Sequence, residues 1–370
     1  EILEARHLLD RGVEYLPSNA ELAERRKRGE GLTRPELAVT LAYAKLTLYS
    51  DLLTSSVPDD PYLARELKRY FPPALAERFP DAIEQHRLRR EIIATMLANS
   101  IVNRGGPSFV GRVADEADAE PAAIARAFAV VRDAFGMTAL NGEIDALDTK
   151  ISGALQLELY AGVENLLLNR TIWFIRNAQL AGGLDELVAH YRQGVERLVK
   201  EFDAFITAEA RQGIEIRAAK FREGGVPEML AQNIARLPLM AAATDIVLIA
   251  DRTGKPIETA ASAYFATRAF FRLDTIFAAA RGIEAQDRFE RLATDRAVDS
   301  IAANERALIA DILAHGTGGG SGEAAVAAWS ETRKDEIARV RSRLQELGAS
   351  GFSLAKLIVA ASLMRDLVKE

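Results

Sequence analysis

The sequence predicts an all-α protein, and three observations support this fold class. Alanine, leucine, arginine and glutamate dominate the 370 residues, and all four favour helices. Alternating runs of β-branched residues, which would indicate strands, are nearly absent. Helix-start signals recur, because Ser18 and Thr33 are each followed three residues later by a glutamate at the spacing of a capping box. We therefore expect a multi-helix bundle or array.

The apolar spacing and the glycine and proline positions place a series of helices along the chain. Pro35 lies in the first turn of one helix, and Gly136 is a typical helix stop. The expected helices are 1–12, 19–29, 34–54, 61–71, 81–104, 107–117, 120–135, 151–178, 184–206, 208–223, 227–236, 239–252, 257–272, 287–314, 323–347 and 353–369.

The expected helix 81–104 is apolar around most of its circumference. Leu88, Ile92 and Met96 form one apolar row. Ile93, Leu97 and Ile101 form another. A helix of this kind is usually surrounded by other helices. We therefore expect it to be the central helix of a bundle.

Three polar residues of this helix could have a special role. Arg90 lies on an apolar face, so we expect a carboxylate or carbonyl partner for it. Asn99 and Asn103 share one side of the helix. We expect them to bond to neighbouring backbone inside the core, and the alternative is a contact with a ligand.

Residues 316–322 differ from the rest of the chain, because five of the seven are glycine. We interpret them as a flexible linker between a multi-helix domain at 1–315 and a C-terminal αα-hairpin at 323–370. A phosphate loop is disfavoured, since no lysine follows the last glycine. The last helix carries an apolar stripe that must pack on its partner helix, the main body or another subunit. The stripe consists of Leu354, Leu357, Ile358, Ala361 and Val368.

Two segments of the chain are similar to each other. Residues 114–137 align without gaps on 250–273, and the alignment pairs Arg132 with Arg268. Alanine inflates such matches, so chance similarity stays open as the alternative. A true repeat would give two similar helical subdomains packed together. It would cover 101–180 and 237–316.

Composition argues against several classes of function. The net charge of −6 gives no general reason to expect nucleic acid as a partner. The chain has no cysteine, which excludes disulfides and thiolate chemistry and fits a cytoplasmic location. Its longest apolar run, 237–250, is too short to span a bilayer and contains Asp245. We therefore expect no membrane partner.

No catalytic, cofactor-binding or metal-ligating residue is predicted. Glycine-rich dinucleotide, Walker and Gly-x-Ser-x-Gly motifs are absent. None of the four histidines lies three or four residues from another, so we expect each to be an exposed helical residue. They are His7, His86, His190 and His315. Basic clusters at 25–28 and 86–91 could bind an anion, but we interpret both as helix surface.

Three stretches carry longer motifs, with weaker similarity through Trp173-Phe174-Ile175-Arg176-Asn177 and Gly225-Val226-Pro227 to the last helix. The three are Gly31-Leu32-Thr33-Arg34-Pro35-Glu36-Leu37-Ala38-Val39 with Leu41-Ala42-Tyr43-Ala44-Lys45, His86-Arg87-Leu88-Arg89-Arg90-Glu91-Ile92-Ile93-Ala94-Thr95 with Asn99 and Val102-Asn103-Arg104, and Asp10-Arg11 with Glu14-Tyr15-Leu16-Pro17. Together they resemble the C-terminal region of the large bacterial NAD-specific glutamate dehydrogenases.

The resemblance implies a parent enzyme that converts L-glutamate, NAD and water to 2-oxoglutarate, ammonia and NADH. In that family the dinucleotide turn and the catalytic lysine and aspartate belong to upstream domains. No position here matches those motifs, so the resemblance assigns no site residue and no cofactor to this chain. The implied partners are the upstream catalytic domains of the same polypeptide and further copies in a homo-oligomer. Because the chain starts at Glu1, we also expect it to be part of a longer polypeptide.

The resemblance thus favours a non-catalytic region that holds domains or subunits in place or transmits effector binding. The alternative is a small-molecule sensor with an amino-acid or nucleotide pocket, for which Arg90, Asn99 and Asn103 are the candidate residues. A third hypothesis, a helix-turn-helix nucleic-acid binder at 250–271, is disfavoured because its second helix is alanine-rich and poor in base-reading residues.

Overall fold

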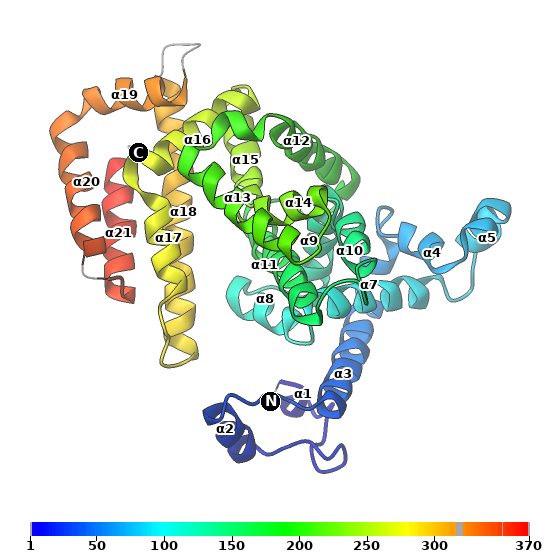
Figure 1. Cartoon of the computed structure of the whole chain (residues 1–370). Helices are drawn as coiled ribbons and strands as arrows, with labels where there is room; N and C mark the ends of the chain where they lie inside the picture. Colours follow the sequence, from blue (N-terminus) through cyan, green and yellow to red (C-terminus); the bar gives the residue numbers. More distant parts are fainter. Residues whose placement is uncertain (1, 316–320, 350, 369–370) are drawn as a thin grey trace. The chain divides into compact units, whose positions relative to one another are not determined.

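The computed structural model describes residues 2–315, 321–349 and 351–368 (Figure 1). Over these ranges the chain forms α-helices and one short 3-10 helix, with no strand. The predicted all-α fold class is therefore confirmed. The chain divides into two compact units, Glu1–His190 (unit 1) and Tyr191–Glu370 (unit 2). The domain boundaries predicted at 315 and 322 stay a prediction beside this division.

Unit 1 contains the first helices of the chain, and α12 (Leu184–Phe205) begins in it and continues into unit 2. The elements are α1 (Ile2–Ala5), α2 (Asn19–Lys27), α3 (Arg34–Leu53), the 3-10 helix η1 (Val57–Asp59), α4 (Arg65–Tyr70), α5 (Pro73–Arg78), α6 (Pro80–Glu84), α7 (Arg89–Gly105), α8 (Phe109–Ala117), α9 (Pro121–Ala134), α10 (Met137–Asp145) and α11 (Gly153–Asn177).

The core of unit 1 forms around α7 and α9. Ile93, Leu97 and Ile101 of α7 are fully buried, and α7 packs against α3 and α4. The prediction of one helix over 81–104 is wrong at its start, because α6 ends at Glu84 and α7 begins at Arg89. In the turn between them, the backbone N–H of Leu88 donates a hydrogen bond to the ring Nδ1 of His86 at 3.1 Å. The partner of this N–H is thus a side chain.

Unit 2 contains the remaining helices. They are α13 (Ala208–Glu223), α14 (Glu228–Met240), α15 (Ala243–Thr253), α16 (Ile257–Phe271), α17 (Leu273–Arg281), α18 (Arg288–His315), α19 (Gly322–Thr332), α20 (Lys334–Ala349) and α21 (Leu354–Leu367).

One hydrophobic core joins the C-terminal helices of unit 2 to the helices before them. Phe271 and Ile301 belong to it together with Trp329 of α19 and Leu357 of α21. α21 packs along α18, which places most of the predicted apolar stripe against the body of unit 2. Ile358 is the exception, because its side chain is 54% exposed.

The predicted linker lies only partly within the described residues, because 316–320 fall outside them. Its last two residues begin a helix. The hydroxyl of Ser321 accepts the N–H of Ala324 at 3.3 Å and caps α19, whose first residue is Gly322. The N–H of Gly322 donates to the hydroxyl of Ser262 on α16 at 2.7 Å. A Cβ at position 322 would lie 2.2 Å from the Ser262 carbonyl group, so only glycine fits this contact.

The two segments that the sequence alignment pairs have matching helix ends. α8 and α15 end at the paired positions 117 and 253, and α9 and α16 begin at the paired positions 121 and 257. α10 and α17 match at both ends. The residue before each of these two helices has a left-handed backbone, with φ of 64° at Gly136 and 55° at Arg272. These matches support the repeat, which stays a proposal.

Among the described residues, no single helix has the length and apolar composition of a membrane span. α14 and α15 reach that composition only as a pair, and their axes are bent by 51° at the break between them.

Candidate functional site

Arg90 has the partners that its place on an apolar helix face requires. Its guanidinium pairs with the carboxylate of Asp59 in η1. It also donates to the carbonyl oxygens of Leu53, the last residue of α3, at 2.8 Å and of Ser55 at 3.1 Å. The prediction of a carboxylate or carbonyl partner is confirmed. Arg90 therefore fastens the start of α7 to the end of α3.

The two asparagines do not lie inside the core. Asn103 is exposed and Asn99 is half-buried, so the prediction of a buried asparagine pair is wrong. The reason is that unit 1 covers the side of α7 that carries Ile93 and Leu97 most completely. About 20 Å of helix axis separates Arg90 from Asn103, at 1.5 Å per residue. These side chains therefore do not form one enclosed polar pocket.

The histidines are mostly on the surface. His190 and His315 are exposed and helical, as predicted, whereas His7 is exposed but lies in the turn after α1. The prediction is wrong for His86, which is half-buried in the turn before α7 with its ring 5.7 Å from that of Phe71. Within the described ranges, no three histidine, aspartate or glutamate side chains form a group that could hold a metal ion.

The most deeply buried charges of unit 1 surround Arg132 on α9. Its guanidinium donates to Glu66 of α4 at 2.7 Å and to both carboxylate oxygens of Asp133, at 3.0 and 2.9 Å. Arg65 and Arg69 pair with the same two carboxylates, each at 2.7 Å. We name these five residues the Arg132 centre. It joins α4 to α9.

Electrostatics at the Arg132 centre favour the ionised state. Burial lowers the pKa of Arg132, but the hydrogen bonds and charges of Asp133 and Glu66 outweigh burial and raise it above its ordinary value. Burial likewise raises the pKa of Asp133, and Arg132 outweighs that effect, so the net change is downward. A buried, hydrogen-bonded ion pair such as Arg132–Asp133 resists rearrangement, because removing one partner leaves the other uncompensated.

Unit 2 has a similar, largely buried arginine at Arg268 on α16. Its Nε lies 3.2 Å from Asp274 of α17 and 3.3 Å from Glu305 of α18. It also donates to the Tyr264 hydroxyl at 3.0 Å, and its guanidinium lies 4.8 Å from the ring of Phe277. We name these five residues the Arg268 centre. It joins α16, α17 and α18.

The Arg268 centre is less completely bonded than its counterpart. Neither the Nε of Arg268 nor the facing Oε1 of Glu305 has a hydrogen-bond partner, although both atoms are buried. Burial raises the pKa of Glu305 to about 7, and Arg268 only partly offsets it because Asp245 and Asp274 add negative charge nearby. Glu305 is thus a buried acid that titrates near neutral pH.

The two centres occupy paired positions of the proposed repeat. In each, the guanidinium lies over the aromatic ring one turn earlier, at 6.0 Å for Phe128 and 5.3 Å for Tyr264. Our site prediction from sequence missed both centres. The available signal was an arginine that aligns between the two segments, Arg132 with Arg268, near the end of an alanine-rich helix with aromatic residues.

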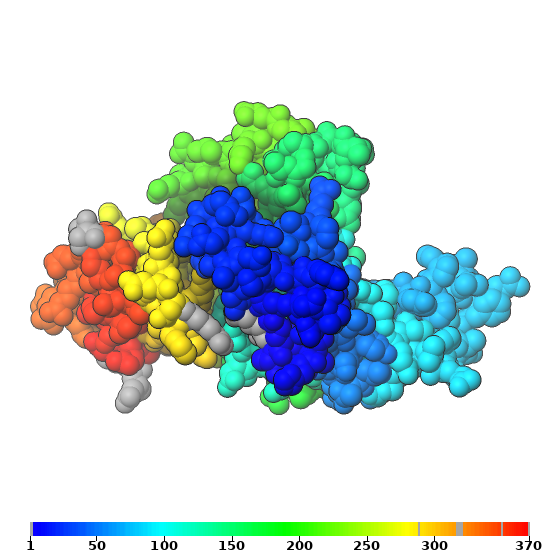
Figure 2. Space-filling model, turned by 90° about the horizontal axis from the view of Figure 1, so that it is seen from below, coloured from blue at the N-terminus to red at the C-terminus, as the bar shows by residue number. Residues whose placement is uncertain are grey.

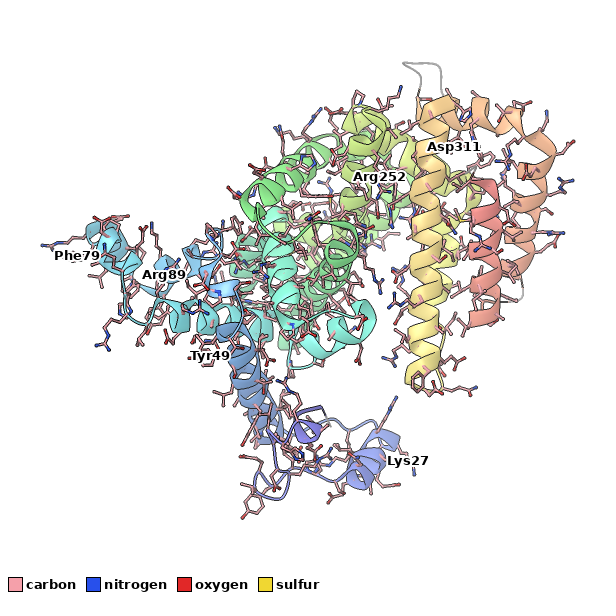
Figure 3. All side chains as sticks on the ribbon, turned by 180° about the vertical axis from the view of Figure 1, so that it is seen from behind. Lys27, Tyr49, Phe79, Arg89, Arg252 and Asp311 are labelled. Carbon is pink, nitrogen blue, oxygen red and sulfur yellow. The ribbon has the colours of Figure 1, made fainter. Side chains whose placement is uncertain are left out.

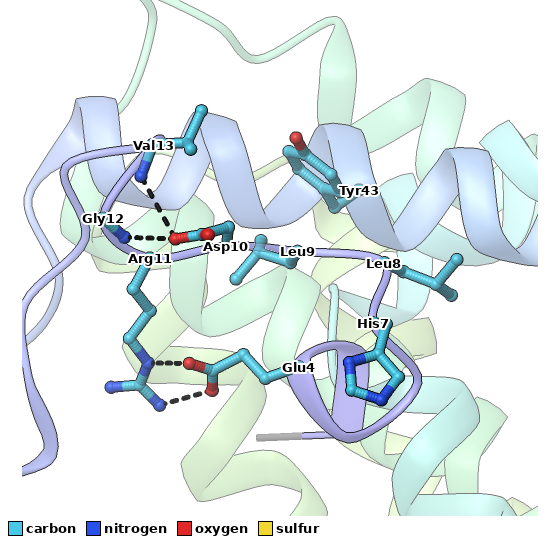
Figure 4. A pocket seen from close by; sticks show the side chains of 9 residues that line it. All are labelled: Glu4, His7, Leu8, Leu9, Asp10, Arg11, Gly12, Val13 and Tyr43. Atoms are coloured by element: carbon cyan, nitrogen blue, oxygen red, sulfur yellow. Dashed lines mark hydrogen bonds and ion pairs between the residues drawn. The ribbon is translucent and has the colours of Figure 1, made fainter.

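A shallow hollow opens among the first residues of unit 1 (Figure 4). The hollow has a volume of about 600 Å³ and is lined by residues 4 and 7–13 together with Tyr43 of α3. Arg11 donates to Glu4 at 2.7 Å across its floor. The predicted helix 1–12 is wrong beyond its first turn, because α1 ends at Ala5 and His7 has a φ of 55°.

These features define the class of protein. It is a helical region, and its buried polar groups connect its own helices to one another. The family model "Glutamate dehydrogenase, C-terminal" matches residues 29–366. The chain therefore belongs to this family, as the sequence motifs had indicated.

Three relatives show the same relationship. The chain is 34% identical over 368 residues to the NAD-specific glutamate dehydrogenase of Pseudomonas aeruginosa. This match covers 99% of the chain and 23% of the relative. The chain is 33% identical over 362 residues to that of Halomonas elongata, covering 96% and 22%. It is 33% identical over 364 residues to that of Mycobacterium tuberculosis, covering 98% and 22%. The chain thus spans less than a quarter of the length of these relatives.

Proposed function

We propose that this chain is the non-catalytic C-terminal region of an NAD-dependent glutamate dehydrogenase, and that it acts on assembly and regulation. The full-length enzyme would convert L-glutamate, NAD and water to 2-oxoglutarate, ammonia and NADH, in the cytoplasm and as a homo-oligomer. The names of the relatives support the activity, and their greater length supports upstream catalytic domains in the same polypeptide.

One observation carries the structural role. The most deeply buried charges of each unit are paired within that unit, at the Arg132 and Arg268 centres, and each centre joins helices that are distant in sequence. Such groups brace a helical array. The charged groups of Glu66, Arg132, Asp133 and Glu305 are not presented to a substrate, because these side chains lie within the packed interior.

The residues of this chain do not fit a nucleotide site of the Rossmann type. That site needs a parallel strand that ends in a glycine-rich turn before a helix. Residues 2–315, 321–349 and 351–368 contain helices and no strand. We therefore assign NAD binding to the upstream part of the parent enzyme.

The rival function, a small-molecule sensor, has less support. The residues proposed for it were Arg90, Asn99 and Asn103. Arg90 is already bound to Asp59 and two carbonyl oxygens, and Asn103 is exposed.

The test uses the full-length enzyme and this chain by itself. Deleting the region should change oligomer size in light scattering, while the Michaelis constants for glutamate and NAD change little in the fraction that assembles. The isolated chain should show no stoichiometric NAD binding by calorimetry at micromolar concentration. Stoichiometric NAD binding by the isolated chain would show that the proposal is wrong.

A further inference from the structure

Helix α3 has the composition of a buried helix for most of its length. Between Leu37 and Tyr49 it carries one charged residue, Lys45. A helix that is apolar around its circumference is normally covered on all sides. The only residues of α3 that this chain buries are Leu48 and Leu52, both near its C-terminal end. In the first two-thirds of the helix Leu37 and Leu46 are exposed, while Val39 and Leu41 are half-buried, so this part presents a partly exposed apolar surface.

The segment before α3 leaves Leu37 and Leu46 of this helix exposed. Three polar links hold the segment to α3: the Tyr43 hydroxyl donates to Glu14 at 2.6 Å, Arg25 pairs with Glu36 at 2.8 Å, and Arg6 pairs with Asp51 at 2.8 Å. α2 itself has no buried residue. Tyr15, in the preceding loop, is 91% exposed. We name residues 2–47 the arm, and Figure 2 shows its side chains in blue on the face seen there.

Large apolar side chains are distributed over the whole arm. Two labelled residues help to locate the arm in Figure 3: Lys27 is the last residue of α2, and Tyr49 lies in α3 just beyond the end of the arm. A surface of this kind on a soluble protein normally marks an interaction site. The exposed apolar residues of the arm are Leu8, Val13, Tyr15, Leu32, Leu37 and Leu46.

Local interactions hold the arm in a defined conformation. Ser18 and Glu21 form a capping box at the start of α2, and Thr33 and Glu36 form another at the start of α3. These bonds satisfy backbone N–H groups that would otherwise have no partner at the helix starts. The apolar surface is therefore presented by formed helices, which reduces the entropy lost when a partner binds.

We propose that the arm docks against the upstream part of the same polypeptide. More than three-quarters of each curated relative lies outside this region, and the family model describes the C-terminal part of the enzyme. The arm is the portion of the region nearest in sequence to what precedes it. A covalent connection gives the two surfaces a high effective concentration, so an apolar contact of moderate area suffices. The inference rests on the proposed function and names its partner surface.

Photo-crosslinking in the full-length enzyme tests the occupant of this surface. A photoreactive amino acid replaces Leu46, which is 63% exposed in this chain. The matched control replaces Ile216 of α13, which is 64% exposed on a helix of unit 2. Enzyme assembled from a mixture of isotopically heavy and light copies distinguishes crosslinks within one polypeptide from crosslinks between copies.

The expected product joins position 46 to a peptide upstream of this region, within one isotopic copy. A crosslink to a second copy, or to residues 191–370, would overturn the proposal. A yield no higher than that from position 216 would also overturn it.

A second measurement compares the aspartate variants Leu46→Asp and Ile216→Asp in the full-length enzyme. Leu46→Asp should make the α3 amides exchange with solvent at least about tenfold faster, because a docked helix opens less often than a free one. Ile216→Asp should leave α3 exchange unchanged. Equal α3 exchange in both variants would contradict docking.

The two proposals fail separately. If the arm is not docked while deletion of the region still alters assembly without altering the Michaelis constants, only the docking inference is wrong. If the isolated chain binds NAD, the proposed function is wrong whatever the arm contacts.

Discussion

The Nε of Arg268 lies 3.3 Å from the Oε1 of Glu305 in the interior of unit 2, and neither atom has a hydrogen-bond partner. These two facing atoms therefore attract each other by charge without a directional hydrogen bond between them. At the Arg132 centre, by contrast, the guanidinium makes hydrogen bonds to Glu66 and Asp133. This difference makes Glu305 the pH-sensitive group of the two centres.

The stability contributed by Glu305 should fall as pH rises from about 4.5 to about 7. Burial raises its pKa in the folded state to about 7 from the ordinary value of 4.5, so the folded state binds the proton more tightly than the unfolded state. The contribution is fully present below pH 4.5 and is lost as pH rises through about 7. Urea unfolding at several pH values should show a smaller downward slope in Glu305→Gln than in the unmodified chain. Parallel curves for the two proteins would contradict this assignment.

Replacing Arg132 with methionine should destabilise unit 1 by about 3 kcal/mol, because it leaves the buried carboxylates of Glu66 and Asp133 with partly exposed partners only. The measurement is the denaturant midpoint at neutral pH. Arg87→Met is the matched control, since Arg87 is exposed, and it should change stability by less than about 0.5 kcal/mol. Equal effects of the two substitutions would mean that the Arg132 centre does not brace α4 and α9.

Gly322→Ala should destabilise unit 2 by about 1–3 kcal/mol, because the new Cβ would meet the backbone of Ser262 and force α19 away from α16. Gly213→Ala is the control on α13, where a Cβ meets nothing within 4 Å. That substitution should instead stabilise the chain by about 0.5–1 kcal/mol, because alanine favours helix. Thermal unfolding of both variants decides the matter, and an unchanged Gly322→Ala protein would contradict the close helix contact.

Leu357→Asp and Ile358→Asp should have very different effects although the two residues are adjacent. Leu357 is fully buried in the core of unit 2, so a charge there should cost more than about 4 kcal/mol and release α21. Ile358 is exposed, so its substitution should cost less than about 1 kcal/mol. Limited proteolysis after α20 reads out the release of α21. Similar proteolysis of the two variants would show that the sides of α21 are assigned incorrectly.

Features specified by local sequence were predictable. The capping boxes at Ser18 and Thr33 and the left-handed stop at Gly136 mark helix ends that the structure has, because backbone bonds within a few residues determine them. The break near His86 was not predicted. There the apolar spacing continues through the turn, so periodicity alone does not reveal that two helices meet.

The sequence by itself determined that this chain is helical and that it belongs to the C-terminal region of glutamate dehydrogenases. The reason is that helix formation and motif similarity both depend on residues that lie close together in the sequence. Only the tertiary structure decided which charges are buried together and which apolar surface stays exposed. Arg132 donates a hydrogen bond to Glu66, 66 positions away in the sequence, and Gly322 donates one to Ser262, 60 positions away. Apolar residues of α3 that look like core in the sequence lie on the surface of this chain, because burial depends on which helices fold back against a given side, and residue type does not specify that.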